Sequence, residues 1–163
     1  MSHSWTEQRV LILGRSEVGL YRLGDSGPEE VQRVATAADA SPASLLVGLS
    51  ELLRQNGSAG CRLQVIVCSH LVRFMLVPWR DEISSPQELR SFVQFCFEQV
   101  YAIEPADWSF TVSPDIKGRS RIAAAMPAEL VTALSQLSQE SGYRLHTVQP
   151  YLTRVFNRFR RHV

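Results

Sequence analysis

Residues 62–79, RLQVIVCSHLVRFMLVPW, form two apolar runs separated by the polar pair Ser69-His70. Alternate residues of a strand point to opposite faces, and in the first run both sets of alternate residues are mostly apolar. Such a strand is typical of a sheet that other elements cover on both faces. The second run ends at Pro78, which has no N–H to give to a neighbouring strand. The segment therefore predicts two core strands with a bend between them.

Strand and helix patterns alternate along the rest of the chain. The sequence predicts a hairpin at 9–23, a turn at 24–30, a weak strand at 31–35, and strands at 108–112, 121–126 and 144–148. It predicts helices from Pro42 to Gly57, from Pro86 to about Tyr101, from Pro127 to about Glu140, and from Tyr151 to Arg161. This order predicts an α/β (or α+β) fold with a mixed β-sheet and crossover helices.

Small polar residues and glycines mark the helix ends. Ser41 is predicted as an N-cap, as is Ser84 or Ser85, and glycines tolerant of positive φ are expected at Asn56-Gly57 and Ser141-Gly142. The predicted buried residues are Leu89, Phe92, Val93, Cys96, Phe97 and Val100 in one helix, and Leu152, Val155, Phe156 and Phe159 in the last. Arg154, Arg158 and Arg161 are expected on the opposite side of the last helix.

The composition is that of an ordinary globular chain. With 163 residues, a single domain can bury a sizeable core. A net charge of +1 gives no whole-molecule attraction for nucleic acid or an anionic membrane. The three cysteines include no close pair, which argues against a disulfide framework and a zinc site. The N-terminus lacks a signal-peptide pattern, so we expect a cytoplasmic protein with reduced thiols.

Serine, histidine and acidic residues are the candidate catalytic groups of this sequence. Ser69-His70 precedes Asp81, but adjacent residues on a bend usually diverge, and no G-x-S-x-G motif surrounds them. His146 lies on a predicted strand, where we expect a partly exposed residue rather than a base. Paired carboxylates can serve acid–base chemistry, but the three that are close in sequence, Glu104, Asp107 and Asp115, include two in a loop where acids commonly cap or turn.

The sequence shows no motif that is typical of nucleotide, metal or nucleic-acid binding. The segment GRSEVG lacks the spacing and the lysine of a P-loop. A two-metal nuclease needs acids on the first strand, where only Glu17 occurs, beyond the glycine turn. The basic end RVFNRFRRHV can meet an anionic membrane or an acidic partner, but a solvated arginine face on a core helix is the more common arrangement. We predict no catalytic, cofactor or metal site and no nucleic-acid partner.

Several stretches nevertheless carry a family resemblance. VIVCSHLVRFMLVPW and the later segments FCFEQVY, DWSFTV, RIAAAMPAELVTAL and SGYRLHTVQPYLTRVFN follow one another in a recognisable order. This order resembles the first half of the actin-like (RNase H-like) proteins PilM of type IV pilus assembly and of the cytoplasmic part of the general secretion pathway protein L. The resemblance covers roughly residues 9–163 and is strongest from 62 to 157.

The resemblance implies how the single domain of residues 1–163 is divided. It implies a sheet lobe at 8–80, a small inserted lobe at 81–150 and a C-terminal helix at 151–163. It also implies that the chain is truncated to the first half of the fold, without the second wall of a nucleotide cleft. Actin-like ATPases carry an Asp-x-Gly on the first strand, whereas Ile12 stands two residues before Gly14 here. An isoleucine cannot ligate Mg²⁺.

The function that the resemblance implies is a non-enzymatic cytoplasmic scaffold or adaptor. It would bind a protein partner of a type IV pilus or type II secretion apparatus, near the membrane through that partner, without a cofactor. Trp79, Arg80, Arg158 and Arg161 are the predicted partner-binding residues. The alternative is half of a nucleotide-binding ATPase, completed by a second chain or by homodimerisation.

Overall fold

The computed structural model describes residues 7–36, 42–114 and 117–159, except for the side chains of residues 42–43 and 156–159. It divides into two compact units, Met1–Leu71 with Thr132–Val163, and Val72–Val131. We call them unit 1 and unit 2 and describe each by itself. Among the described residues, no helix is long and apolar enough to cross a membrane.

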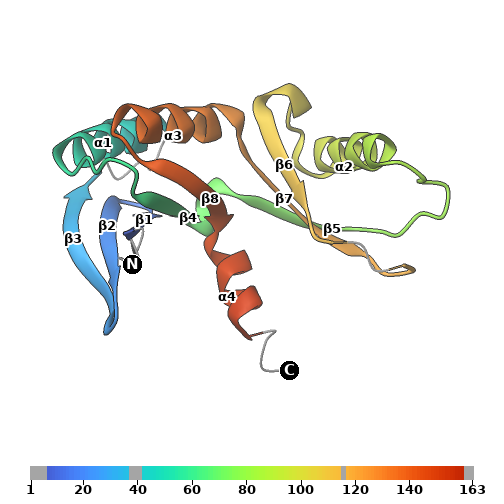
Figure 1. Ribbon diagram of the computed structural model, residues 1–163. Coiled ribbons are helices and arrows are strands. Elements are labelled where there is room, and N and C mark those ends of the chain that lie inside the picture. Colours follow the sequence, from blue (N-terminus) through green and yellow to red (C-terminus); the bar gives the residue numbers. More distant parts are fainter. Residues whose placement is uncertain (1–6, 37–41, 115–116, 160–163) are drawn as a thin grey trace. The chain divides into compact units, whose positions relative to one another are not determined.

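A five-stranded mixed sheet forms the centre of unit 1 (Figure 1). Its strands are β1 (Gln8–Leu13), β2 (Glu17–Gly24), β3 (Gly27–Ala35), β4 (Arg62–Val67) and β8 (Arg144–Pro150), in the order β3-β2-β1-β4-β8. The β1–β2 and β2–β3 pairs are antiparallel, whereas the β1–β4 and β4–β8 pairs are parallel. Parallel neighbours require crossovers, which the helices supply. The predicted α/β fold with a mixed sheet is confirmed.

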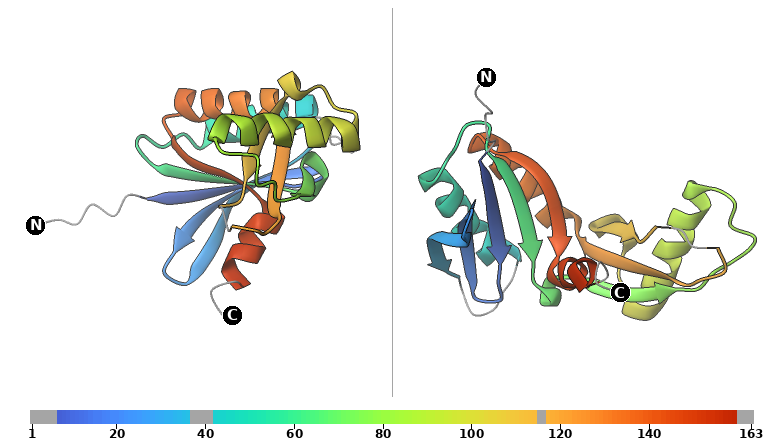
Figure 2. Two further views of the ribbon diagram at one scale, coloured as in Figure 1. Left: turned by 90° about the vertical axis from the view of Figure 1, so that its right-hand side faces the viewer. Right: turned by 60° about the horizontal axis from the view of Figure 1, so that its bottom comes forward.

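The main core of unit 1 lies between this sheet and its helices. Alternation along the strands places fully buried residues of β1, β2 and β4 on one face, namely Leu11, Leu13, Val18, Leu20, Leu63, Val65 and Val67. The helix α1 (Pro42–Gln55) packs against β2 and β3, and its Leu45, Leu49, Leu52 and Leu53 are fully buried. Figure 1 and the left view of Figure 2 show the end of α3 (Ala128–Glu140) on the same side of the sheet as α1.

The C-terminal ends of α1 and α3 approach each other closely. Gly142 ends α3 with a φ of +80°, as predicted. Gly57 was expected to have a positive φ as well, and that prediction is wrong. A Cβ atom at Gly57 would lie only 3.1 Å from the carbonyl oxygen of Ser141, so this glycine permits the close approach. The hydroxyl of Tyr143 donates to the carbonyl of Asn56 beside it.

Unit 2 is a three-stranded antiparallel sheet with one helix against it. Its strands are β5 (Arg73–Val77), β6 (Trp108–Val112) and β7 (Arg121–Pro127), in the order β5-β7-β6, and the helix is α2 (Pro86–Tyr101). The buried core consists of Val77, Val93, Phe97, Ala123 and Ala125. The alanines of the central strand leave room for the Phe97 ring, which meets the Phe110 ring edge-on at 5.3 Å between centroids.

Ser85 is the N-cap of α2, one of the two serines that the sequence predicted, and it forms a capping box with Glu88. The Glu88 N–H donates to the Ser85 hydroxyl at 3.2 Å, and the Glu88 carboxylate accepts from the Ser85 N–H at 3.2 Å. Pro86 occupies the first turn, where a missing N–H costs nothing. Hydrogen bonds, chiefly from the Ser84 N–H, hold the pKa of Glu88 below its ordinary value.

Two strands lie in other sheets than the sequence predicted. We expected β5 in the lobe at 8–80 and β8 in the lobe at 81–150. Instead, β5 pairs with β7 in unit 2, and β8 pairs with β4 in unit 1. A 3-10 turn at Ser69–Leu71 interrupts the chain after β4, so β5 does not continue the ladder of β4. The sheet of unit 1 is completed only when the chain returns through α3.

Smaller differences concern β3 and α2. The predicted turn at 24–30 is shorter, because Gly24 pairs with Gly27 across a tight turn and β3 starts at Gly27, whose φ is +117°. Val100 was expected to be buried but is exposed. The buried line of α2 follows Val93 and Phe97 at four-residue spacing toward Tyr101, which turns Val100 outward.

Candidate partner-binding surface

One face of the unit 2 sheet lies opposite α2 and is partly open. Phe74 and Leu76 on β5 share it with Ile122, Ala124 and Met126 on β7, because alternate residues point to opposite faces. Ala124 and Met126 are buried, whereas Leu76 is 66% exposed and Ile122 is 42% exposed. These two residues are register partners, so their side chains are neighbours across the strands. We call them the Leu76–Ile122 patch.

Trp79 and Arg80, two of the predicted partner-binding residues, lie in the segment after β5. Trp79 is half-buried, and its Nε1–H donates to Asp81 Oδ1 at 2.9 Å. The Arg121 guanidinium lies over the Trp79 ring, 5.3 Å from its centroid. Arg80 is exposed and lies 5.9 Å from the centroid of Phe92. Cation–π contacts of about 0.5–1 kcal/mol hold both side chains against unit 2.

The end of β1, at Ile12, is where the actin-like resemblance places a metal-binding carboxylate, and a glycine turn follows it. The Gly14 N–H donates to the Glu17 carbonyl at 2.8 Å, and a Cβ at Gly14 would lie 2.9 Å from that oxygen. Ile12 is 37% exposed and offers no oxygen ligand. The described residues contain no cluster of three or more histidine, cysteine or acidic side chains suited to a metal ion.

The bend after β4 brings a cysteine and a histidine together. Cys68 Sγ lies 2.9 Å from His70 Nδ1, a contact that no motif in the sequence predicts. Burial raises the pKa of the Cys68 thiol, which disfavours the nucleophilic thiolate. Cys96 of α2 was expected to be buried, and both Cys68 and Cys96 are half-buried. The neighbouring Ser69 is exposed.

The acidic and histidine candidates occupy ordinary positions. Glu104 precedes the short 3-10 helix η2 (Pro105–Asp107), which Asp107 ends, and both acids are exposed. Asp115 lies outside the described residues. His146 is exposed on β8, as the strand alternation predicted.

The terminal helix α4 (Tyr151–Phe159) differs from its predicted orientation. Arg154 was expected on the outer side but is half-buried, and its Nη1–H donates to Gln64 Oε1 of β4 at 2.9 Å. Leu152 was expected to be buried but is exposed. The reason is that α4 begins directly after Pro150 of β8, so the strand end sets which side of the helix meets the sheet. The side chains of Arg158 and Arg161 lie outside the described residues.

No protein-family model and no curated protein sequence matches this chain. The fold, by contrast, matches solved structures and is the actin-like fold of the pilus and secretion proteins that the sequence resembles. The cytoplasmic domain of EpsL, an inner membrane component of the type II secretion system of Vibrio cholerae, superposes with a TM-score of 0.63 at 12% identity, over 88% of this chain.

Two further solved structures have the same fold. A Bacteroides thetaiotaomicron protein with an actin-like ATPase fold gives a TM-score of 0.62 at 11% identity over 98% of this chain. The PilM–PilN type IV pilus biogenesis complex gives 0.52 at 18% identity over 86% of this chain. This chain spans 57%, 58% and 46% of the lengths of the three matched chains. At these identities the likeness shows the fold alone.

Proposed function

We propose that this chain is a non-enzymatic scaffold that binds a protein partner of a type IV pilus or type II secretion apparatus. The Leu76–Ile122 patch is the observation that carries the proposal. Two large apolar side chains stand exposed side by side on one sheet face. Single exposed apolar residues are normal on a protein surface, whereas contiguous apolar patches commonly mark interaction sites. The actin-like fold shared with EpsL and PilM supports the choice of apparatus.

Trp79 and Arg80, which follow β5, are further proposed partner contacts, and Arg80 lies near Phe92 of α2. Tryptophan and arginine are enriched among the residues that dominate binding energies. Trp79 is half-buried, and Asp81 and Arg121 hold its ring in place, so it loses little conformational freedom when a partner covers it. Arg80 is exposed, and its guanidinium lies 5.9 Å from the centroid of the Phe92 ring. Arg158 and Arg161 stay predicted contacts, because their side chains lie outside the described residues.

Nucleotide hydrolysis is not part of the proposal. Ile12 lacks the carboxylate that a bound magnesium ion needs at this place. No observation in the described residues favours the alternative of an ATPase completed by a second chain, and a Mg-ATP titration tests it directly.

Site-specific photo-crosslinking in cells tests the scaffold proposal. We would introduce p-benzoylphenylalanine at position 76, irradiate, and identify cross-linked proteins by mass spectrometry. The matched control is Val47 of α1, which is 69% exposed and apolar but lies alone on its helix. We expect a pilus or secretion component to cross-link at position 76 and not at position 47. Equal cross-linking at both positions, or at neither, would contradict the proposal.

A further inference from the structure

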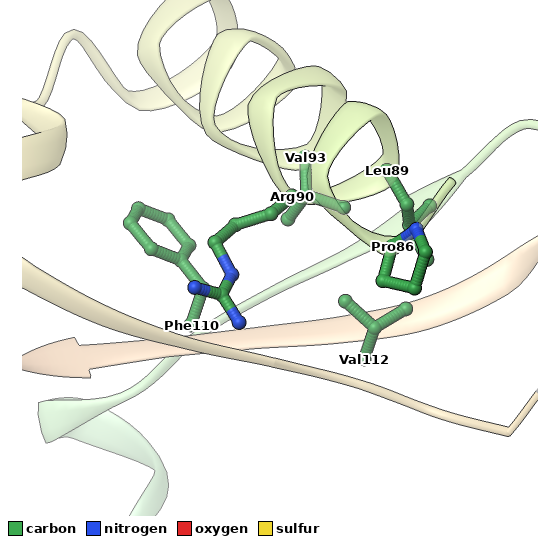
Figure 3. Close-up of a pocket in the computed structure, with 6 residues that line it drawn as sticks. All are labelled: Pro86, Leu89, Arg90, Val93, Phe110 and Val112. Atoms are coloured by element: carbon green, nitrogen blue, oxygen red, sulfur yellow. The ribbon is translucent and has the colours of Figure 1, made fainter. Parts of the chain in front are cut away.

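A second surface of unit 2, the α2–β6 groove, lies between the N-terminal half of α2 and the strand β6. The groove encloses about 200 Å³ and is lined by Pro86, Leu89, Arg90, Val93, Phe110 and Val112 (Figure 3). Five of the six lining residues are apolar. Small-molecule sites in proteins usually measure about 300–1,000 Å³. This groove is smaller, and its volume suits one apolar side chain of a peptide better than a cofactor.

Arg90 is exposed and adds a positive charge to the lining of this otherwise apolar groove. Its side chain reaches from α2 toward β6, between Phe110 and Val112 (Figure 3). Within the described part of the chain, its guanidinium makes no hydrogen bond or ion pair. A guanidinium in such a setting is complementary to a carboxylate, which it can bind through two parallel hydrogen bonds.

The strand beside the groove has one open edge. In the order β5-β7-β6, the strand β6 pairs with β7 and with no other strand of the described residues. The Ser113 N–H donates to the Ile122 carbonyl at 2.8 Å, and hydrogen bonding alternates along an antiparallel pair. The backbone N–H and C=O groups of Phe110 and Val112 therefore face away from β7. Such an edge can accept an added strand.

The opposite edge of the same sheet is partly closed. By the same alternation, the backbone groups of Phe74 on β5 face away from β7. The Phe74 carbonyl accepts a hydrogen bond from the Tyr101 hydroxyl at 2.5 Å. The β6 edge is thus the one that combines unpaired backbone groups, an apolar pocket and an uncompensated cation.

We propose that the α2–β6 groove binds an extended segment of a protein partner, which adds a strand to β6. An apolar side chain of that segment fills the pocket, and an adjacent aspartate or glutamate pairs with Arg90. This inference rests on the proposed scaffold function and specifies the chemistry of the partner segment. Main-chain pairing supplies affinity, while the pocket and the cation select the sequence.

Selection of random short peptides displayed on phage, against the full chain, tests this proposal. We expect the enriched peptides to share an apolar residue next to an acidic one, in a strand-forming context without proline. Their affinities are then measured by fluorescence polarisation with three variants. Arg90→Glu reverses the charge, Val112→Pro removes an outward N–H without touching the ladder to β7, and Arg54→Glu on α1 is the matched control. Circular dichroism and thermal melting confirm that each variant is folded.

The expected result is a loss of about tenfold or more for Arg90→Glu and for Val112→Pro, and no loss for Arg54→Glu. Absence of enriched peptides, a consensus without an acidic residue, or equal binding by all three variants would overturn the proposal. A chain that dimerises through this groove, in a manner abolished by Arg90→Glu in analytical ultracentrifugation, would also overturn it by making a second copy the occupant. None of these outcomes changes the cross-linking expected at position 76, so the two proposals fail separately.

Discussion

The Tyr101 hydroxyl donates a hydrogen bond to the Phe74 carbonyl oxygen, joining the last turn of α2 to the outer edge of β5. Phe97 stacks on the Tyr101 ring at 5.7 Å between centroids, which fixes where the hydroxyl points. The contact satisfies an edge carbonyl that would otherwise be available to another chain. It therefore holds the helix on the sheet and closes part of one sheet edge.

Replacing this hydroxyl is expected to weaken unit 2 without leaving a cavity. Tyr101→Phe should lower the free energy of unfolding by about 1 kcal/mol, because one partly buried hydrogen bond is lost. Chemical denaturation followed by circular dichroism measures the change. Tyr151→Phe on α4 is the control, because Tyr151 is exposed. An unchanged midpoint for Tyr101→Phe would mean that water replaces the hydroxyl at Phe74.

Phe97 and Phe95 lie on the same helix, α2, but we expect their replacement by alanine to have very different effects on stability. Phe97 is fully buried, so Phe97→Ala should cost about 3–5 kcal/mol and unfold unit 2. Phe95 is 54% exposed, so Phe95→Ala should change stability by less than about 0.5 kcal/mol. Hydrogen exchange of the β7 amides reports both effects. Protection of β7 that survives Phe97→Ala would contradict the assignment of the core.

The capping box makes the stability of α2 depend on pH. Hydrogen bonds from Ser84 and Ser85 lower the folded-state pKa of Glu88, so its stabilising effect is fully present above the unfolded pKa of about 4.3. That effect is lost as the pH falls through the lower folded-state pKa. In Glu88→Gln, this part of the acid dependence should be absent, whereas Glu98→Gln in the same helix should retain it. Identical acid titrations of Glu88→Gln and the natural chain would contradict the argument.

Thermal-shift titration with Mg-ATP distinguishes a scaffold from half an ATPase. A ligand at 100 times its dissociation constant would add about 2.7 kcal/mol of stability. We expect no shift for the isolated chain, because Ile12 offers no ligand for the metal. Clear stabilisation would contradict the proposed non-enzymatic role, and Mg-GTP provides the comparison for nucleotide specificity.

Local patterns in the sequence predicted the order of elements and much of their packing. The leucine spacing of α1 and the Ser85-Pro86 start of α2 are short-range signals, and both match the structure. The distribution of strands between two sheets was not predictable in the same way. The partner of β5 is β7, far along the chain, and nothing in RFMLV specifies which edge it joins.

The candidate site was predictable only in part. Trp79 and Arg80 stand out because they follow a strand that ends in proline, yet their stacking on Arg121 and Phe92 depends on tertiary contacts. Strand alternation alone predicts that Leu76 and Val77 point to opposite faces of the sheet. Which of these faces is exposed depends on the position of α2, which the sequence does not specify. Arg90 looks like any exposed helix residue until β6 is placed beside it.

The division into units has a consequence for how the protein forms during synthesis. Unit 2 is one uninterrupted stretch, Val72–Val131, whereas unit 1 needs Thr132–Val163 in addition to Met1–Leu71. Strand β4 is made early, but its parallel neighbour β8 leaves the ribosome only after all of unit 2. Unit 2 can therefore fold first. During this time β4 lacks its neighbour β8, and its unpaired edge can form incorrect strand pairs. The sheet of unit 1 therefore gains β8 beside β4 only after all of unit 2 has been synthesised.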